Sequence, residues 1–436
     1  MKAKQVFNNA KWIIICKIAQ SLIQFVIGML CARYLQPENY GLINYAASLV
    51  AFVTPIMKLG FDATLVRELV EDPHGEREIM GTSLLLNIFS SVVCVAGVTL
   101  FSFLVNMGDT VTIIVCFLYS LSLLFLAVEM IQYWFQYKLI SKYSSLVMLC
   151  AYALVSVYKV FLLVTQKSVL WFAVSNAIDY GLIGITLVVL YMKWGSGFSF
   201  SFKRAKSMLS SSKHYILAAA MLVIIQNTDH IMITNMVSKE ENGFYSAAIT
   251  CATAVQFVYL AIIDSFRPLI LQNKKENSSE YELNVTRLYS ITLYMAMAQC
   301  IVFTVFSRLI VTVLYGQGYV NTIPILQILV WYFIFSVMGA VRNVWILAEE
   351  KQKYLWIINL SGAIFNIVLN SVLIPYFGAC GAAFASFLTQ FFANFILGFI
   401  IKDIRPNNKL VIKSLNPVFL VREMKKIIGT VIKKKT

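Results

Sequence analysis

The sequence is poor in charge, in histidine and in paired cysteine motifs. Only 13% of its 436 residues are charged, and 59% are hydrophobic. Soluble domains are about one quarter charged and roughly 45–50% apolar, so a water-soluble protein is excluded. The eight cysteines lie in apolar stretches without C-x-x-C spacing, and the three histidines are scattered. Disulfides, zinc sites and cofactors are therefore not expected, and the sequence contains no motif for ATP hydrolysis.

Long apolar segments recur along the whole chain. Each has about the 20 residues that a helix needs to cross a bilayer, and each is too long for a barrel strand. We therefore predict an all-α integral membrane protein with twelve transmembrane helices. The segments are 12–32, 41–60, 81–106, 110–136, 144–164, 169–192, 215–236, 243–264, 288–307, 322–347, 354–375 and 380–401.

The basic residues are distributed unevenly between the two sides of these segments. Of 36 lysines and arginines, 29 lie on the side of the N-terminus and four on the opposite side, while Lys17, Lys159 and Arg342 lie within spans. This asymmetry predicts that both termini are cytoplasmic and accounts for the net charge of +15 without a nucleic-acid partner. The loops on the opposite side are too short for a catalytic domain, so we do not expect an enzyme.

The two halves of the chain contain a weak repeat. RYLQPENYGLINYAA aligns with NMVSKEENGFYSAA at an offset of 202, which pairs Gly41 with Gly243 and Glu38 with Glu240. Because an offset of six spans preserves orientation, the halves are predicted to be parallel, pseudo-symmetric six-helix lobes around a central cavity, as in alternating-access transporters. The predicted domains are an N-terminal lobe (1–193), a cytoplasmic linker (194–213), a C-terminal lobe (214–402) and a tail (403–436).

The tail combines helical periodicity with positive charge. Its apolar residues from Leu420 to Val431 repeat at helical spacing, and Arg422, Lys425 and Lys426 lie between them. We predict a basic amphipathic helix on the anionic cytoplasmic leaflet. A solvated tail without regular structure is the alternative.

Polar residues form stripes on two of the predicted spans. In the first span the stripe combines the charge of Lys17 with Gln20 and Gln24, and in the seventh Gln226 and Asn227 precede Asp229 and His230. Because charge in hydrocarbon is costly, such stripes face protein or water. We favour cavity lining for Lys17 over extension of its side chain to the interface. Asp229, with His230, is a candidate for ion coupling, and equally a partner for a nearby base.

Other polar residues within spans have simpler interpretations. Glu129, Gln132 and Gln136 share one face of the fourth span. Lys159 in the fifth span and Asp179 in the sixth form a structural pair in our favoured reading, and a substrate role for them is the alternative. Asn359, Asn366 and Asn370 in the eleventh span are expected to join helices within the second lobe.

The sequence resembles a known family in several ordered segments. These are ARYLQPENYGLINYAASLVAF with LGFDATLVREL, WFQYKLISKY, NTDHIMITNMVSKEENGFYSAA and NLSGAIFNIVLNSVLIPYFGACGAAFAS. Together they resemble the polysaccharide transporter (Wzx-type oligosaccharide flippase) branch of the multidrug/oligosaccharidyl-lipid/polysaccharide exporter (MOP) superfamily, over about residues 5–402. The resemblance implies a two-lobe, MATE-like fold in the bacterial plasma (inner) membrane.

The resemblance also implies a substrate and a mechanism. It implies that an undecaprenyl-pyrophosphate-linked glycan crosses from the cytoplasmic to the outer leaflet by alternating access, for O-antigen or other surface polysaccharide synthesis. Membrane lipids, a glycan polymerase and a chain-length regulator are the implied partners of a monomeric protein. We expect Lys17 to attract the pyrophosphate and amides and hydroxyls to bind the sugars. The predicted substrate-binding residues are Lys17, Gln20, Gln24, Arg33, Asn44, Gln226, Asn227, Thr250 and Gln256.

Two other functions remain as alternatives. A cation-coupled drug or small-molecule antiporter of the same superfamily would place unpaired carboxylates deep in its cavity, and Asp229 keeps that alternative open. A membrane glycan-processing enzyme would need acid or base residues in a sizeable loop or domain, which the short loops do not provide.

Overall fold

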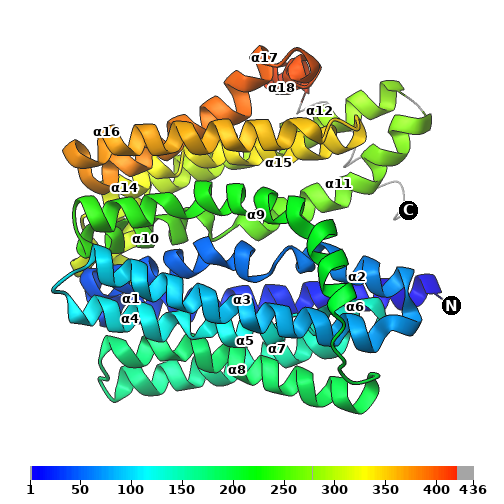
Figure 1. Cartoon of the computed structure of the whole chain (residues 1–436). Coiled ribbons are helices and arrows are strands. Elements are labelled where there is room, and N and C mark those ends of the chain that lie inside the picture. Colours follow the sequence, from blue (N-terminus) through cyan, green and yellow to red (C-terminus); the bar gives the residue numbers. More distant parts are fainter. Residues whose placement is uncertain (1, 277, 420–436) are drawn as a thin grey trace, which may run out of the picture. The chain divides into compact units, whose positions relative to one another are not determined.

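The computed structural model describes residues 2–276 and 278–419, and over this part of the chain it contains helices and turns but no strand (Figure 1). The chain divides into two compact units, Met1–Ser246 and Ala247–Thr436. The first unit therefore contains the first eight helices, the whole of α9 and the start of α10. The placement of the lobe boundary at 194–213 stays a prediction.

The first unit is a bundle of helices joined mostly by short turns. Its elements are α1 (Lys2–Met57), α2 (Phe61–Glu71), η1 (Pro73–Gly75), α3 (Glu76–Val105), α4 (Thr110–Ser120), α5 (Ser122–Glu129), α6 (Gln132–Tyr137), α7 (Ser141–Val164), α8 (Val169–Trp194), α9 (Phe202–Met236) and the start of α10 (Lys239–Thr253). We call the end that holds the turns at 58–60, 72–75 and 138–140 the proximal end, and the end with the turns at 106–109, 165–168 and 237–238 the distal end.

The second unit continues the all-helical pattern. Its elements after α10 are α11 (Gln256–Glu276), α12 (Ser278–Val305), α13 (Ser307–Tyr315), η2 (Gln317–Tyr319), α14 (Thr322–Leu329), α15 (Tyr332–Ala348), α16 (Lys353–Phe391), the π turn η3 (Phe392–Ile396), α17 (Leu397–Ile400), η4 (Lys402–Ile404) and α18 (Arg405–Ser414).

Nine helices in the described residues are long and apolar enough to cross a membrane, or ten when α10 and α11 count as one bent span. Two of the nine, Ile15–Glu71 with most of α1 and Lys353–Ile400 with α16, each extend over two of the predicted spans. They bend at Gln36 (φ 59°) and Gly378 (φ 55°), where the backbone leaves the helical region. Pro37 follows the first of these bends and lacks the N–H that would continue the helix. The prediction of an all-helical, multi-pass membrane protein is confirmed, whereas the count of twelve and the side of the termini stay predictions.

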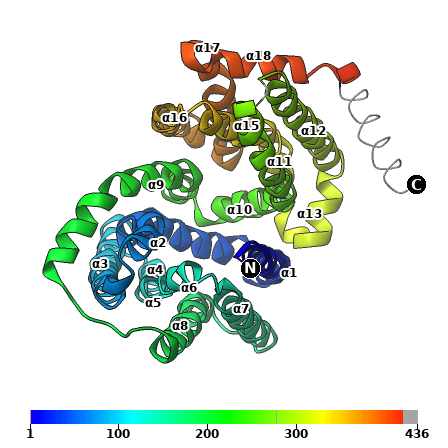
Figure 2. The ribbon, with the colours of Figure 1, turned by 90° about the vertical axis from the view of Figure 1, so that its right-hand side faces the viewer.

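The first unit exposes apolar side chains around its circumference. Phe89 of α3, Val157 of α7 and Val189 of α8 are 71%, 69% and 61% exposed. In water, such a continuous apolar surface would cause association, but it matches the hydrocarbon of a bilayer. Inside the proximal end, Trp134 packs edge-on against Phe135 and Tyr191, with ring centroids 5.1 and 5.2 Å apart. Figure 2 shows the bundle in end view, with the chain between α8 and α9 running along its edge.

The connection between α8 and α9 is fastened to the start of α3. The Ser199 N–H donates to the Arg77 carbonyl at 3.0 Å, and the Ser201 N–H donates to Thr82 Oγ1 at 3.0 Å. Gly81 faces the Ser199 backbone, which leaves no space for a Cβ. Residues that were predicted to be a linker are therefore held along the proximal end of the bundle.

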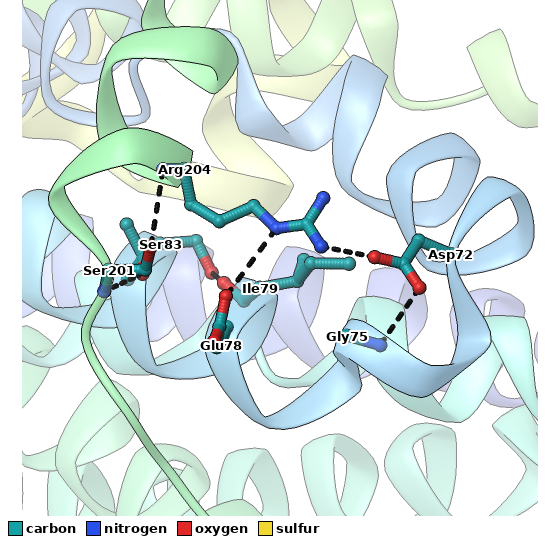
Figure 3. A network of polar contacts seen from close by, with 8 residues as sticks. Asp72, Gly75, Glu78, Ile79, Ser83, Ser201 and Arg204 are labelled. Carbon is teal, nitrogen blue, oxygen red and sulfur yellow. Dashed lines mark hydrogen bonds and ion pairs between the residues drawn. The ribbon is translucent and has the colours of Figure 1, made fainter.

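Arg204 fixes the connection between α8 and α9 through ion pairs with two carboxylates. Figure 3 shows Arg204, in the first turn of α9, extended between Asp72 and Glu78. The hydrogen bond from Arg204, followed by that from the Gly75 N–H, lowers the pKa of the Asp72 carboxyl. The start of α9 is thereby tied to the α2–α3 turn.

The start of the tail packs on the second unit. In α18, Asn407 accepts a hydrogen bond from the Tyr289 hydroxyl at 2.9 Å, and Asn408 Nδ2 donates to the Phe395 carbonyl at 2.8 Å. Leu410 and Val411 are buried in the same core. Residues 405–414 are therefore an integral part of this unit. The amphipathic helix predicted between Leu420 and Val431 lies outside the described residues.

Candidate substrate cavity

The first unit encloses a cavity of about 190 Å³ between α1, α4, α7 and α8. Both halves of α1 contribute to it, because the bend at Gln36 folds the second half back along the first. Its lining residues are Gln24, Ile27, Gly28, Cys31, Leu35, Tyr40, Ile43, Asn44, Ala47, Tyr119, Tyr152, Lys159, Phe172, Ser175 and Asn176.

Several polar groups in this cavity are available to a ligand. The side chains of Gln24, Lys159 and Asn176 make no hydrogen bond or ion pair with any other described residue. Asn44 Nδ2 donates to the Tyr40 carbonyl at 2.8 Å, and Ser175 Oγ donates to the Phe172 carbonyl at 2.6 Å, so the oxygens of both side chains remain as acceptors. The cavity thus combines one ammonium group with amides, hydroxyls and aromatic rings.

The predicted pairing of Lys159 with Asp179 is not formed as a direct contact. The two groups attract each other electrostatically, but among the described residues neither makes an ion pair. Asp179 is 9% exposed, and its Oδ1 has no hydrogen-bond partner. Lys159 lines the cavity instead. The favoured interpretation from the sequence was therefore wrong in this geometric respect.

Five of the predicted binding residues lie along α1. Gln24 lines the cavity, and so does Asn44 after the bend. Lys17 is exposed and Gln20 partly buried, one to two turns nearer the proximal end on the same stripe, and neither lines the cavity. Arg33, also predicted, is exposed just before the bend.

The other four predicted binding residues are not part of this cavity. Gln226 is exposed on α9, and Asn227 Nδ2 donates to the Val223 carbonyl of the same helix at 3.1 Å. Thr250 and Gln256 belong to the second unit. A substrate role for each of these residues stays a prediction.

Asp229 and His230, the predicted ion-coupling residues, belong to a buried polar network. The Tyr245 hydroxyl donates to Asp229, and His230 Nδ1 lies 2.7 Å from Asn242 Oδ1. Asn242 Nδ2 in turn donates to the Gly41 carbonyl at 2.8 Å. This network joins α9 to the start of α10 and to the second half of α1, so it has at least a structural role.

The repeat residues Gly41 and Gly243 meet at the same place. A Cβ added to Gly41 would collide with the Lys239 carbonyl and lie 2.6 Å from the Gly243 nitrogen, and one added to Gly243 would collide with the Pro37 carbonyl. Pro37 and Lys239 are themselves 202 positions apart. The contact is therefore reciprocal, as in an interface with local two-fold symmetry. Only glycine allows the two backbones to approach this closely.

An ion pair at the distal end supports this crossing. Lys239 pairs with Asp109, which also caps α4 through the Thr112 N–H at 3.1 Å. Partial burial raises the pKa of the Asp109 carboxyl, but the hydrogen bonds from Lys239 and Thr112 outweigh it and lower the pKa. The start of α10 is thus fixed to the α3–α4 turn.

The sequence contained signals for two of the cavity residues that were not among the predicted substrate-binding residues. Lys159 is an ammonium within a span, and Asn176 lies three residues before Asp179 on the sixth span, so both are costly in lipid. Tyr119 and Tyr152 had no comparable signal, because aromatic residues are common throughout the spans. The rotation of α4, α7 and α8 about their axes, which the sequence does not contain, brings all four to one cavity.

Comparison with known sequences identifies relatives. Residues 6–274 match the model of a family described as polysaccharide biosynthesis proteins. The chain is also 20% identical over 392 residues to the capsular polysaccharide biosynthesis protein CapF of Staphylococcus aureus, which covers 88% of this chain and 96% of CapF.

Solved structures share the fold at low sequence identity. The lipid II flippase MurJ in an inward closed conformation aligns with a TM-score of 0.71 and 14% identity, over 94% of this chain and 92% of MurJ. An inward-facing multidrug resistance MATE transporter of the MOP superfamily aligns with a TM-score of 0.70 and 12% identity, over 91% of this chain and 96% of that one. The chain therefore has the fold of MOP superfamily transporters.

Proposed function

Because the chain belongs to the polysaccharide biosynthesis protein family, we propose that it is a flippase for lipid-linked oligosaccharides. The substrate is an undecaprenyl-pyrophosphate-linked repeat unit, which moves from the cytoplasmic to the outer leaflet of the bacterial plasma membrane. The observation that carries the proposal is the cavity of the first unit, where the Lys159 ammonium lies among amides and aromatic rings and has no bonded partner within the described part of the chain. An ammonium held this way inside a membrane bundle is available to a negatively charged ligand.

The size of the cavity limits what it holds. At about 190 Å³ it is smaller than the roughly 300–1,000 Å³ of typical ligand pockets, so it accommodates one part of the substrate at a time. Lys159 would attract a phosphate, while the carbonyl oxygens of Gln24 and Asn44 would accept hydrogen bonds from sugar hydroxyls. Phe172 and Tyr152 provide apolar ring surface against which a sugar ring can pack.

Lys17 keeps its proposed role as an earlier contact for the pyrophosphate. It lies on α1, on the same stripe as Gln24 and nearer the proximal end. In this proposal the anion meets Lys17 first and Lys159 second, and both lysines lower the cost of taking a doubly charged group through the membrane. No covalent chemistry is involved, since the protein changes only the position of its substrate.

Complementation of a bacterial strain that lacks its own repeat-unit flippase tests the proposal. We expect Lys159→Ala to reduce surface glycan at least about tenfold, which corresponds to about 1.4 kcal/mol of lost binding, and to accumulate lipid-linked repeat units. Lys17→Ala should give a smaller loss. Lys167→Ala, which removes an exposed lysine just after α7, is the matched control. Normal glycan export by the Lys159→Ala variant would remove the cavity from the mechanism.

The antiporter alternative would require the same cavity to bind a cation instead of an anion. A lipophilic cation would be repelled by the Lys159 ammonium, whereas an anionic substrate is attracted to it. Efflux of a fluorescent cationic dye from cells that express the wild-type protein would favour the antiporter. We expect no efflux above that of cells without the protein.

A further inference from the structure

The first unit holds a second, much smaller pocket at its proximal end. Its volume is about 10 Å³, which is close to the space needed by one water molecule. The α1–α2 turn, α3, α5 and α6 all contribute to its wall. The lining residues are Lys58, Asp62, Asn87, Leu126, Glu129, Met130, Gln132 and Tyr133.

Two buried oxygens in this pocket receive no hydrogen bond from any residue that the structure describes. Asn87 is 2% exposed; its Nδ2 donates to the Met130 sulfur at 3.1 Å, and its Oδ1 has no partner. Glu129 accepts a hydrogen bond on Oε1 from Gln132 at 2.8 Å, and its buried Oε2 has no partner. Because buried acceptors are normally satisfied, the pocket needs a hydrogen-bond donor or a positive charge.

When all are ionised, the side chains around Glu129 carry one more negative charge than positive charge. Lys58 attracts Glu129 electrostatically without forming an ion pair, and Asp62 lies in the same wall. From α8, Asp179 and Tyr180 interact electrostatically with Glu129, and Asp179 in turn with Lys159 of the substrate cavity. Tyr133 is the remaining titratable group in the wall. Three carboxylates thus face two ammonium groups, and one proton would balance them.

The pocket lies between two interruptions of the helical backbone. In the α1–α2 turn, Leu59 and Gly60 have positive φ angles of 52° and 71°. On the other side, α5 ends at Glu129 and α6 begins at Gln132. A Cβ on Gly60 would lie 2.7 Å from the Ser212 carbonyl, so the turn that lines the pocket packs against α9. Breaks of this kind are the points at which helices change direction.

We propose that Glu129 is a proton-binding site and that its protonation changes the packing of the α1–α2 turn against α9. The proton comes from hydronium in the adjoining solvent and forms an O–H bond at Oε2, and water is released. The new hydroxyl donates to Asn87 Oδ1, directly or through one water molecule. Lys58 is then freed from its attraction to Glu129. This site is distinct from the buried Asp229–His230 network.

Infrared difference spectroscopy on the purified full chain in liposomes tests the site without any glycan, so its outcome is separate from that of the flippase proposal. On acidification from about pH 8 to about pH 5, a window that spans physiological pH, we expect the band of a protonated carboxyl group to appear. Glu129→Gln should remove the part of this band that comes from Glu129, while Asp179 and other carboxyl groups keep theirs. Glu71→Gln, which changes an exposed carboxylate on α2, should leave the Glu129 component in place. A band of unchanged intensity and frequency in Glu129→Gln would overturn the proposal.

A second variant and a second ion sharpen the result. Asn87→Leu removes the proposed acceptor and should shift the band of Glu129 to higher frequency while keeping its pH dependence, because the O–H group loses a hydrogen bond. An unshifted band would show that Asn87 is not the acceptor and would overturn the geometry. Addition of Na⁺ at constant pH should leave the band unchanged. Its loss with Na⁺ would assign the pocket to that cation instead of the proton.

Discussion

Each of the two units carries a basic side chain within one of its apolar spans, and the two side chains differ in their contacts. Lys159 of the first unit lines a cavity and has no bonded partner among the described residues. Arg342 of the second unit is 3% exposed, and its Nη1 donates to the Ala393 carbonyl at 2.9 Å. Its Nη2 donates to Asn343 Oδ1 at 3.3 Å. The Arg342 guanidinium is thus bonded within the fold, whereas the Lys159 ammonium is available for the ligand that we propose.

The backbone around Ala393 explains why the Arg342 guanidinium is bonded within the fold. Ala393 lies in the π turn Phe392–Ile396, where the helical hydrogen-bond pattern shifts by one residue. Such a shift leaves a carbonyl without its usual donor, and a guanidinium group can satisfy it. In α7 the helix is regular around Lys159, so no carbonyl requires the ammonium. We therefore expect charge inside a span to indicate function only where the surrounding backbone does not already bind it.

The largest effect on stability is expected from Arg342→Met. The substitution keeps most of the volume and leaves the Ala393 carbonyl unsatisfied, at a cost of about 1.5–3 kcal/mol. Thermal or denaturant unfolding in detergent micelles measures this loss. Arg342→Lys should recover part of it. Unchanged unfolding together with lost transport would instead make Arg342 a functional residue and break the comparison.

The next effect concerns the contact between the two repeated motifs. Gly41→Ala or Gly243→Ala places a Cβ against backbone atoms, and overpacking of this kind costs about 1–3 kcal/mol. Gly28→Ala is the matched control, because nothing lies within 4 Å of its added Cβ. Unfolding in detergent micelles should show a loss of stability for Gly41→Ala and Gly243→Ala but not for Gly28→Ala. Equal stability of Gly41→Ala and Gly28→Ala would contradict the close crossing.

Lys159→Met should change stability least among the substitutions inside the bundle. Since the ammonium has no bonded partner among the residues that the structure describes, we expect the free energy of unfolding to stay within about 0.5 kcal/mol or to rise. Export of glycan, measured in the same strain, should still fall. A loss of stability as large as that of Arg342→Met would show that Lys159 also supports the fold.

The smallest effect is expected from the ion pairs outside the spans. In the first unit, the hydrogen bond from Arg204 lowers the pKa of Asp72. In the second unit, burial raises the pKa of Glu349, but the hydrogen bonds from Lys274 and Tyr281 outweigh this effect, so the pKa is lowered. A lowered folded-state pKa contributes stability above the unfolded value, and this contribution is lost as pH falls through the folded value. Stability should therefore decrease below about pH 4.

Melting temperatures measured across this acidic range, at low and high salt, test the acid effect. Asp72→Asn should flatten part of the pH dependence, and high salt should reduce what remains, since Asp72 and Arg204 lie near solvent. An unaltered pH profile in both Asp72→Asn and Glu349→Gln would show that neither ion pair contributes.

Much of the architecture followed from the sequence because lipid imposes strict conditions on it. Apolar segments of the right length predicted helices, and the offset of 202 paired Gly41 with Gly243, which the structure brings together. The continuous α1 was not predicted, since the pattern of apolar residues does not distinguish a bend at Gln36 from a loop. Nor did the apolar pattern reveal that residues 405–414 pack as a helix on the second unit.

For the candidate site, helical spacing identified the polar stripe on α1 but not the residues of α4, α7 and α8 that line the cavity with it. Gln24 and Asn44 were predicted to bind substrate and do line the cavity, while Lys17 and Gln20 lie outside it. Lys159 was predicted to pair with Asp179 because the two residues have opposite charges and lie on consecutive spans. The sequence does not show the direction in which each side chain points. That direction depends on how α7 and α8 rotate as they pack against α1 and α4.

The sequence by itself determined that this is a helical membrane protein with polar stripes and a strongly asymmetric distribution of basic residues, because the exclusion of charge from hydrocarbon acts on each segment separately. Only the tertiary structure decided which polar groups share a space. It placed the ammonium of Lys159 in a cavity and the guanidinium of Arg342 against a π turn, since the environment of a side chain depends on the neighbouring helices that face it.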